Sequence, residues 1–442
     1  MNGSGGAAGL LRQIVGAQKG GTAVGVVSVC SAHPLVLQAA MEQAREDGLP
    51  LLIESTVNQV NQFGGYTGMR PADFAAFLFK IASGAGFPSG RLFLGGDHLG
   101  PYPWRREQAT LAMEKARALV ADSVRAGYTK LHLDACMPLA GDTPDPRHGL
   151  DPALIARREA ELAGASEAAF REHRREAAPA EEPVYVIGTD VPSPGGIAAE
   201  GEGVTLTIPA ELRRTVDLCA EAFGAAGLAE AWGRVCAVVV QPGVEFGDRS
   251  VHSYDRGRAA ELCAAARQLA GMVLEGHSTD YQSPARLREL VEDGVAVLKV
   301  GPALTFAVRE ALFALEHVEG ELAAGDGEAS GLGEALDQAM LADPSQWRSY
   351  YRGEERELRL ARRFSLLDRC RYYWAVPSVQ LAVERLLANL GTLPLPWPLL
   401  SQYLPRQSAR VLEGALPAEP LALVRDAVRE VLRIYSAAVA PE

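Results

Sequence analysis

Eight short apolar segments, alternating with helical segments, restrict the fold of this sequence more than any other feature. Most are rich in β-branched residues, and together they extend from residue 24 to residue 301. Strands covered on both faces of a parallel sheet have such continuous apolar character. The eight predicted strands are Val24–Val29, Leu49–Ser55, Arg91–His98, Lys130–Ala135, Val184–Asp190, Cys236–Pro242, Met272–Ser278 and Val295–Gly301.

The segments between these strands have the period of amphipathic helices. Apolar residues recur at i, i+3, i+4 and i+7 in residues 37–44 and again in residues 74–81. Pro34 and Pro71 precede these patterns, where a missing N–H does no harm to a helix. Eight alternations of strand and helix predict a (β/α)8 TIM barrel.

The alternation ends near residue 320, and this sets the predicted domain organisation. We expect a flexible N-terminus over residues 1–20, the (β/α)8 barrel over 21–320 and a C-terminal α-helical extension over 321–442. Aromatic residues, including Trp347 and Trp374, cluster in this extension. Because aromatic clusters mostly serve burial, we interpret the extension as a helical cap on the barrel or on another subunit.

Charge and hydropathy exclude several classes of partner. The chain carries 43 Lys and Arg against 55 Asp and Glu, a formal net charge of −12, without a long basic run. This disfavours nucleic acid or an anionic membrane as the main partner. No apolar stretch is long enough to cross a bilayer, and the N-terminus lacks a signal-peptide pattern. We therefore expect a cytoplasmic protein, a homo-oligomer, with a small-molecule ligand.

Polar side chains follow nearly every predicted strand. In a TIM barrel all eight strand ends face one side, and the active site lies there. The segment GGDHLGP is the most distinctive, because it ends an apolar run with adjacent Asp97 and His98. The other strand ends contribute Ser28, Cys30, Ser31, Glu54, Asp134, Asp190, Gln241, Glu245, Glu275, His277, Ser278, Asp280 and Lys299.

Imidazoles and carboxylates converging on one barrel mouth are suitable ligands for a divalent metal ion. We predict that His98, His277 and Glu245 hold Zn, Mn, Ni or Co and leave a position open for substrate. A structural network of salt bridges at the rim is the alternative. His132 remains open between two interpretations, filling a barrel layer or serving the site.

Amide and hydroxyl groups near the strand ends are suited to binding sugar hydroxyls. The loop NQVNQFGGYTG (58–68) carries several of them, which favours a binding loop over a simple turn. A doubly phosphorylated sugar would require more Lys, Arg or backbone N–H groups. The predicted substrate-binding residues are Ser31, His33, Asn58, Gln59, Asn61, Gln241, Ser278, Asp280 and Lys299.

Long motifs along nearly the whole chain resemble one known family. SVCSAHPLVLQAA, LGGDHLGP, VVVQPGVEFGD, EGHSTDYQ and LKVGPALTFA are similar to motifs of the GatZ/KbaZ-like non-catalytic subunit of class II D-tagatose-1,6-bisphosphate aldolase, earlier labelled tagatose-6-phosphate kinase. The resemblance implies a TIM barrel related to the class II aldolases. Kinase activity is not expected, since no GxxxxGK[ST] loop is present.

Compared with the catalytic class II aldolases, the resemblance implies that His98 ligates zinc and that Asp97 exchanges the proton of the C4 hydroxyl. His277 matches another zinc histidine. The histidine of the sixth strand is replaced by Gln241, with Glu245 the nearest candidate ligand. The catalytic enzymes also carry a phosphate-binding GGSG loop and a KxN motif. Here STDYQ follows His277, and Lys299-Val300-Gly301 replaces KxN. The resemblance therefore implies that both the metal ligands and the phosphate-binding residues differ from theirs.

Two functions follow from these features. The first is a metal-dependent enzyme of D-tagatose metabolism that acts on a ketohexose or ketohexose phosphate. Asp97, Glu54 or Asp134 would take the proton of the C4 hydroxyl, the C3–C4 bond would break, and re-addition to the other face would give the C4 epimer, as between D-fructose and D-tagatose. Reported ketohexose 4-epimerases among the family's relatives permit this outcome. A Gly/Pro-rich loop after Asp190 is predicted to serve as a lid.

The alternative function is the one that the family label implies. The barrel would be an accessory, non-catalytic subunit that stabilises a catalytic class II aldolase chain. A barrel without catalysis should lose its costly charged groups, because unpaired charges destabilise a fold. This sequence keeps many of them, which favours the enzyme.

Overall fold

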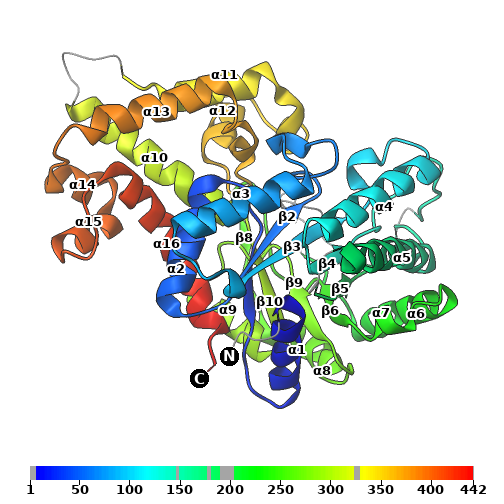
Figure 1. Ribbon diagram of the computed structural model, residues 1–442. Coiled ribbons are helices and arrows are strands. Elements are labelled where there is room, and N and C mark those ends of the chain that lie inside the picture. Colours follow the sequence, from blue (N-terminus) through cyan, green and yellow to red (C-terminus); the bar gives the residue numbers. More distant parts are fainter. Residues whose placement is uncertain (1–5, 146–148, 177–180, 190–203, 323–328, 442) are drawn as a thin grey trace.

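Eight parallel strands close into a barrel in the computed structural model (Figure 1). The structure describes residues 6–145, 149–176, 181–189, 204–322 and 329–441. Around the barrel the strands follow their order in the chain, and the last pairs with the first. The (β/α)8 prediction is therefore confirmed. The strands are β1 (Val26–Val29), β2 (Leu51–Thr56), β3 (Leu92–Leu99), β4 (Lys130–Leu133), β5 (Val184–Ile187), β6 (Val235–Val240), β9 (Val273–Gly276) and β10 (Val295–Val300).

A helix follows each barrel strand and covers its outer face. Proline begins most of them, as at Pro34 and Pro71, and Gly48 ends the first with a φ of 67°. A short hairpin, β7 (Glu245–Phe246) and β8 (Val251–His252), and the short helix α7 (Ala229–Trp232) interrupt the pattern. The eight helices are α2 (Pro34–Asp47), α3 (Pro71–Gly84), α4 (Ala109–Arg125), α5 (Pro152–Glu176), α6 (Pro209–Ala225), α8 (Arg256–Arg267), α9 (Pro284–Glu292) and α10 (Pro302–Leu322).

An additional helix, α1 (Gly6–Lys19), closes the barrel at the end opposite the strand carboxyl ends. The expectation of a flexible N-terminus is wrong for these residues. Leu11 and Ile14 of α1 are buried, and they pack in one cluster with Val26, Leu52 and other strand side chains. The hydrophobic effect explains why α1 is ordered, because its apolar face and the floor of the barrel shield each other from water.

We expect Ile14→Val to lower the free energy of unfolding by about 0.5–1.5 kcal/mol, because Ile14 is fully buried and the change removes one methylene from this floor. Urea denaturation of the full chain measures the effect. The neighbouring Gln13 is exposed, so Gln13→Ala should stay within about 0.5 kcal/mol of the parent. Equal stability of the two variants would mean that α1 does not pack against the strands.

The C-terminal region is helical, as predicted, and its helices pack in two separate places on the barrel. Helices α11 (Leu332–Ala342), α12 (Glu355–Phe364), α13 (Pro377–Gly391), α14 (Trp397–Tyr403) and α15 (Pro405–Leu412) lie beside the barrel (Figure 1). The last helix, α16 (Pro420–Val439), returns to pack on α2, α9, α10 and β1. The Tyr435 hydroxyl donates to the Thr279 carbonyl at 2.6 Å, and the Gly25 N–H donates to the Val439 carbonyl at 3.0 Å. The C-terminal helix is thus part of the outer ring.

A segment between α12 and α13 lies across the barrel mouth. The Leu366 N–H donates to the Asp248 carbonyl at 3.0 Å, and the Tyr281 hydroxyl donates to the Leu366 carbonyl at 2.7 Å. The Thr305 hydroxyl of α10 donates to the Asp368 carboxylate at 2.6 Å. These contacts fix the short 3₁₀ helix Arg369–Tyr373 beside the strand ends, so the cap supplies side chains to the site.

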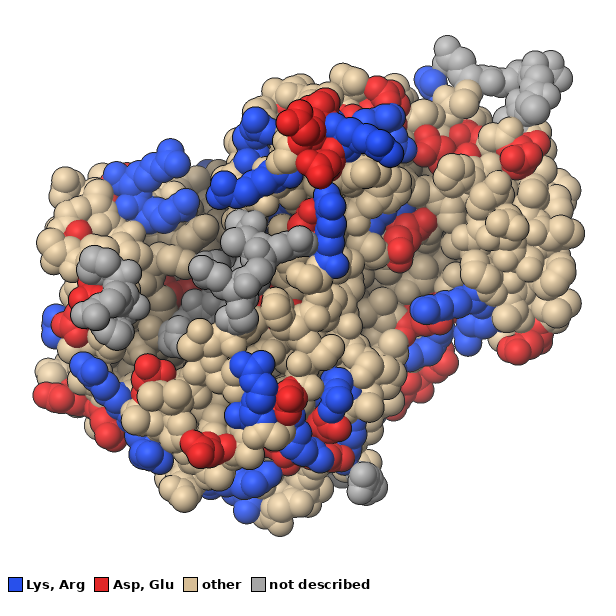
Figure 2. Space-filling view, turned by 180° about the vertical axis from the view of Figure 1, so that it is seen from behind, with Lys and Arg blue, Asp and Glu red and all other residues tan. Residues whose placement is uncertain are grey.

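Charges of both signs are mixed on the surface in view (Figure 2). On the face seen in Figure 2, Lys and Arg are interspersed with Asp and Glu, and no continuous basic stripe is in view. Within the described ranges, no helix combines the length and the apolar character that crossing a bilayer requires.

Candidate metal and sugar site

Strand β3 places Asp97 and His98 at the barrel mouth together, although consecutive strand residues normally point to opposite faces. His98 has a φ of 50°, and the pairing of β3 with β4 shifts its register between Gly96 and Leu99. Such a bulge redirects side chains. Positive φ at a non-glycine residue costs about 1–3 kcal/mol and is common at functional sites. The local backbone is therefore strained where it presents two ionisable groups.

The glycines before this pair make room inside the barrel. A Cβ atom on Gly95 would lie 3.0 Å from Cγ of Glu54 and 3.0 Å from the Lys130 carbonyl oxygen. A larger residue here would crowd the Glu54 side chain and the backbone of β4, and glycine avoids both contacts. The GG sequence thus allows a second acidic group from β2 to reach the interior.

Three imidazole rings meet at the mouth, from β3, β4 and the end of β9. The ring centroids of His98 and His277 are 4.9 Å apart, and His132 lies 5.0 Å from each. Metal–nitrogen bonds of about 2 Å put the centroids of three rings on one tetrahedral ion roughly 5 Å apart. The spacing therefore fits a single divalent ion.

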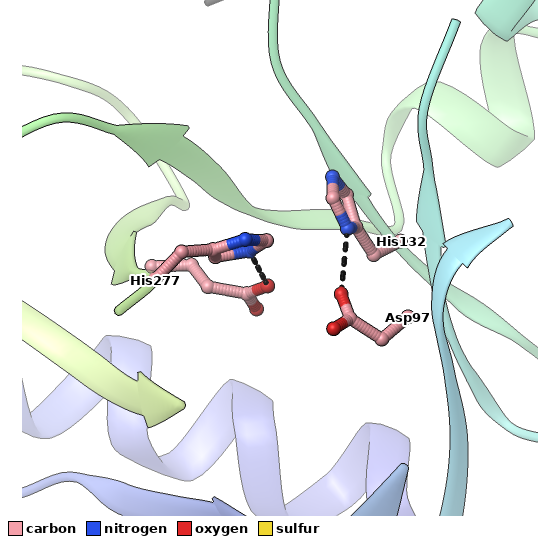
Figure 3. Close-up of side chains that lie close together, drawn as sticks. Asp97, His132 and His277 are labelled. Carbon is pink, nitrogen blue, oxygen red and sulfur yellow. Dashed lines mark hydrogen bonds and ion pairs between the residues drawn. The ribbon is translucent and has the colours of Figure 1, made fainter. Parts of the chain in front are cut away.

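Each imidazole also contacts a carboxylate through one of its nitrogens. His98 Nδ1 lies 2.7 Å from Asp134 Oδ2, His132 Nδ1 lies 2.9 Å from Asp97 Oδ1, and His277 Nε2 lies 3.0 Å from Glu275 Oε1. Figure 3 shows the His132–Asp97 contact, with His277 facing that pair. A proton on Nδ1 of His98 and on Nε2 of His277 would leave the other nitrogen of each ring with a lone pair, the arrangement that carboxylates give to metal-binding histidines. Nδ1 of His132 also accepts the backbone N–H of His98 at 3.1 Å.

A buried atom without a partner supports the same interpretation. Nε2 of His132 is buried and has no hydrogen-bond partner among the described residues. Buried polar atoms are nearly always satisfied, and an unpaired imidazole nitrogen in a fold interior is costly. A metal ion would satisfy it.

Two lysines hold the acidic groups in place beneath the histidines. Lys130 Nζ lies 2.7 Å from both Glu54 and Glu275. Lys299 Nζ lies 2.7 Å from both Glu54 and Asp97. Lys130, Glu54 and Glu275 have no exposed side-chain area. The salt-bridge network considered from the sequence thus exists, and it lies beneath the histidines.

The network sets the protonation of the site. Burial alone would raise the pKa of Asp97, but nearby His98 and Lys299 outweigh it and hold the pKa of this carboxyl well below its usual range. Burial lowers the pKa of His277 to about 3, so its imidazole is neutral. Burial also acts to lower the pKa of His98, but Asp97 and Asp134 overcome it and raise the pKa. Asp97 is thus an ionised carboxylate and His277 a neutral imidazole at the same site.

A second set of candidate ligands shares His132 and His277 with the first and does not include His98. One ligand atom each of Asp97, His132, Glu275 and His277 lies within 4.8 Å of all the others. We favour the three histidines, because Asp97 and Glu275 are already paired with Lys299 and Lys130. The carboxylates then orient the imidazoles.

We expect Asp134→Asn to weaken zinc binding by about 10–100-fold, because loss of a carboxylate behind a ligating histidine has effects of this size. The amide oxygen can still accept the Cys136 N–H, which Asp134 now accepts at 3.0 Å. Competition with a chromophoric chelator measures the affinity. Asp142 pairs with Arg158 instead, so Asp142→Asn is the control that should leave zinc affinity unchanged. Unchanged affinity in Asp134→Asn would contradict the assignment of His98.

A cavity of about 390 Å³ opens above this centre. That volume lies within the range of small-molecule pockets, roughly 300–1,000 Å³. Ten of the residues predicted from the sequence line it: Ser31, His33, Asn58, Gln59, Asp97, His98, His277, Ser278, Asp280 and Lys299.

Five predicted residues do not line the cavity. Glu54 lies beneath it and Asp134 lies behind His98. Asn61 accepts the N–H groups of Phe63 and Gly65 and so shapes its own loop. Gln241 accepts the Gly243 N–H at 2.8 Å. The first two support the site, and the next two order the loops.

Glu245 is the fifth of these residues, and the structure does not bring it into the histidine group. Its carboxylate accepts the Phe246 N–H at 3.0 Å in the hairpin β7–β8. Burial raises its pKa to about 7, partly offset by the Phe246 N–H and by Ser278. We therefore replace Glu245 by His132 in the proposed ligand set.

Several lining residues were not predicted from the sequence. Arg371, Tyr372 and Trp374 come from the cap, whose aromatics we interpreted as packing residues. Trp347 does pack in the core, but the Tyr372 ring contacts Tyr66 with centroids 4.7 Å apart above the mouth. In the sequence Arg371, Tyr372 and Trp374 stand in the segment RYYW (371–374), and no local pattern separates them from packing residues. The predicted lid after Asp190 lies outside the described residues.

Comparisons with known proteins cover nearly the whole length of the chain. Residues 11–440 match the family described as D-tagatose-1,6-bisphosphate aldolase subunit GatZ/KbaZ-like. Two relatives named D-tagatose-1,6-bisphosphate aldolase subunit GatZ, from Salmonella heidelberg and Escherichia coli, are each 46% identical, over 98% and 96% of this chain and 100% and 99% of theirs. A crystal structure described as a "probable tagatose 6 phosphate kinase", from Sinorhizobium meliloti, is 45% identical with a TM-score of 0.84, over 94% of this chain and 100% of that one.

Proposed function

This chain belongs to the GatZ/KbaZ-like family of D-tagatose-1,6-bisphosphate aldolase subunits, and from this premise we propose that it acts in D-tagatose metabolism as such a subunit. The observation that carries the proposal is the 46% identity to two named subunits over nearly full length. In this role the barrel binds and stabilises a catalytic class II aldolase chain.

Co-purification tests the subunit function. We expect the full chain to form a complex with a class II tagatose-bisphosphate aldolase and to raise the thermal stability of that chain. Serum albumin at the same concentration is the control for crowding. If neither a complex nor a stabilisation is found with cognate aldolase, the subunit function is wrong.

One specific observation favours a second function, catalysis by this chain itself. Three equally spaced imidazoles, each against a carboxylate, lie under a cavity of sugar size. We propose that His98, His132 and His277 hold a divalent metal ion and that the cavity binds a ketohexose. When bound, the ion would supply Lewis acidity toward the ketose carbonyl.

The chain's own residues account for the proton transfers of a C4 epimerisation. Asp97, kept ionised by Lys299, takes the proton of the C4 hydroxyl. C4 becomes an aldehyde as the C3–C4 bond breaks. The electron pair of that bond forms the C2–C3 double bond of an enediolate. After the aldehyde turns, C3 attacks its other face and Asp97 returns the proton to the C4 oxygen. Asn58 and Gln59 at the cavity wall can hold the hydroxyls of the fragments.

Product analysis tests this second function. Chelator-treated full chain is given Mn, Zn, Ni or Co with D-fructose or D-tagatose. We expect metal-dependent interconversion of the two hexoses. Release of trioses would indicate an aldolase, and no turnover with any metal would contradict catalysis by this chain.

A further inference from the structure

An internal carboxylate fills the position at which many barrels bind phosphate. In TIM barrels the loops after the last two strands and a helix N-terminus frequently form a phosphate site. Here the corresponding helix is α10, and Asp280 follows β9. Oδ1 of Asp280 accepts the N–H of Gly301 at 3.1 Å and the N–H of Ala303 at 2.8 Å. Pro302, between them, has no N–H to offer.

The place of Asp280 makes this more than a helix cap. Asp280 is 2% exposed, and it lines the same cavity as His98 and His277, together with Gly301 and Pro302. The N–H groups that a phosphate oxygen would need at this end are therefore occupied. A dianion placed there would also meet a buried negative charge at close range, which is unfavourable.

The cationic side chains of the cavity are likewise committed. Lys299 is paired with Glu54 and Asp97. Arg371, the other Lys or Arg that lines the cavity among the described residues, donates to the carbonyls of Leu367 and Asp368 and to the Tyr372 hydroxyl. The ammonium group of Lys299 is thus neutralised by carboxylates, and both Nη atoms of Arg371 already donate to acceptors within the protein.

We propose that Asp280 makes this cavity selective for ketohexoses without a phosphate at the end that faces α10. This inference rests on the proposed binding of a ketohexose and narrows its substrate class to neutral sugars at that end. The carboxylate acts by exclusion: it occupies the N–H donors and repels the phosphate, while sugar hydroxyls can still donate to it.

Inorganic phosphate is the probe that tests Asp280 independently of any activity. We expect the full chain to bind it too weakly to measure by calorimetry, and Asp280→Ala to bind it at least about 10-fold more tightly, because the N-terminus of α10 is then open. Asp280→Asn keeps an acceptor for both N–H groups and removes the charge, so it should gain less. This variant carries the test if Asp280→Ala does not fold.

Asp255 is the matched control. It caps α8 by accepting the N–H groups of Gly257 at 2.9 Å and Arg258 at 3.2 Å, on the exposed surface. Asp255→Ala should gain no phosphate affinity, so a gain specific to Asp280→Ala supports the proposal. Equal phosphate affinity of all variants would overturn it.

Sugar binding separates this inference from the proposed function. We expect the metal-loaded full chain to bind D-tagatose more tightly than D-tagatose 1,6-bisphosphate, with the preference reduced in Asp280→Ala. Tighter binding of the bisphosphate to the parent chain would overturn the inference. If the parent binds no ketose, the proposed catalytic function fails, while the phosphate titration still decides the role of Asp280.

Discussion

Asp97→Asn is expected to lower kcat for the interconversion of D-fructose and D-tagatose by about 10²–10⁴-fold, the usual contribution of a positioned acid–base group. An amide cannot take the proton of the C4 hydroxyl, so the C3–C4 bond cannot break with its help. The carboxylate that it replaces lies 2.9 Å from His132 Nδ1 and 2.7 Å from Lys299 Nζ, at the wall of the cavity.

Metal content distinguishes this chemical effect from damage to the site. Asp97→Asn keeps the size of the side chain and leaves all three proposed histidine ligands in place, so this variant should still bind metal while turnover falls. The exposed helix cap Asp255 serves again as control, since Asp255→Asn should leave kcat unchanged. A normal kcat in metal-loaded Asp97→Asn would remove Asp97 from the mechanism.

Lys130→Met is expected to lower the free energy of unfolding by about 3–5 kcal/mol, because removal of one partner from a buried ion pair leaves an uncompensated charge. Glu54 and Glu275 would both lose an ammonium group at 2.7 Å, at positions without solvent contact. Urea denaturation of the apo chain measures the change. This expected loss of stability does not depend on whether the chain is an enzyme.

Lys80 provides the comparison for this prediction. It is exposed on α3, so Lys80→Met should change stability by no more than about 0.5 kcal/mol. If Lys130→Met is no more destabilising than Lys80→Met, the buried network beneath the histidines does not exist as described.

The barrel could be predicted from the sequence because its signals are local. Each strand is a continuous apolar run, and each intervening helix has its own period and its own proline or glycine boundary. The role of α1 could not be predicted in this way, because Leu11 and Ile14 find their partners on strands far along the chain. The same holds for α16, whose contacts with α2 and β1 join the two ends of the sequence.

The sequence predicted the residues that line the cavity better than it predicted the proposed metal ligands. Ten predicted residues line the cavity because all strand ends face one side. The choice of His132 over Glu245 depends on how β4 and the β7–β8 hairpin are placed around the mouth, which no local pattern encodes. The cap residues Arg371 and Trp374 depend on contacts between distant segments, and aromatic density alone points to burial.

The central claim is that His98, His132 and His277 together hold one divalent ion. Equilibrium dialysis of the chelator-stripped full chain against Co²⁺, followed by elemental analysis, tests it most directly. We predict about one tightly held ion per chain and its loss in His132→Ala, with His317→Ala, which replaces a ring stacked on Tyr403, retaining the ion. A parent chain that holds no stoichiometric ion, or a His132→Ala variant that holds it equally well, would contradict the account.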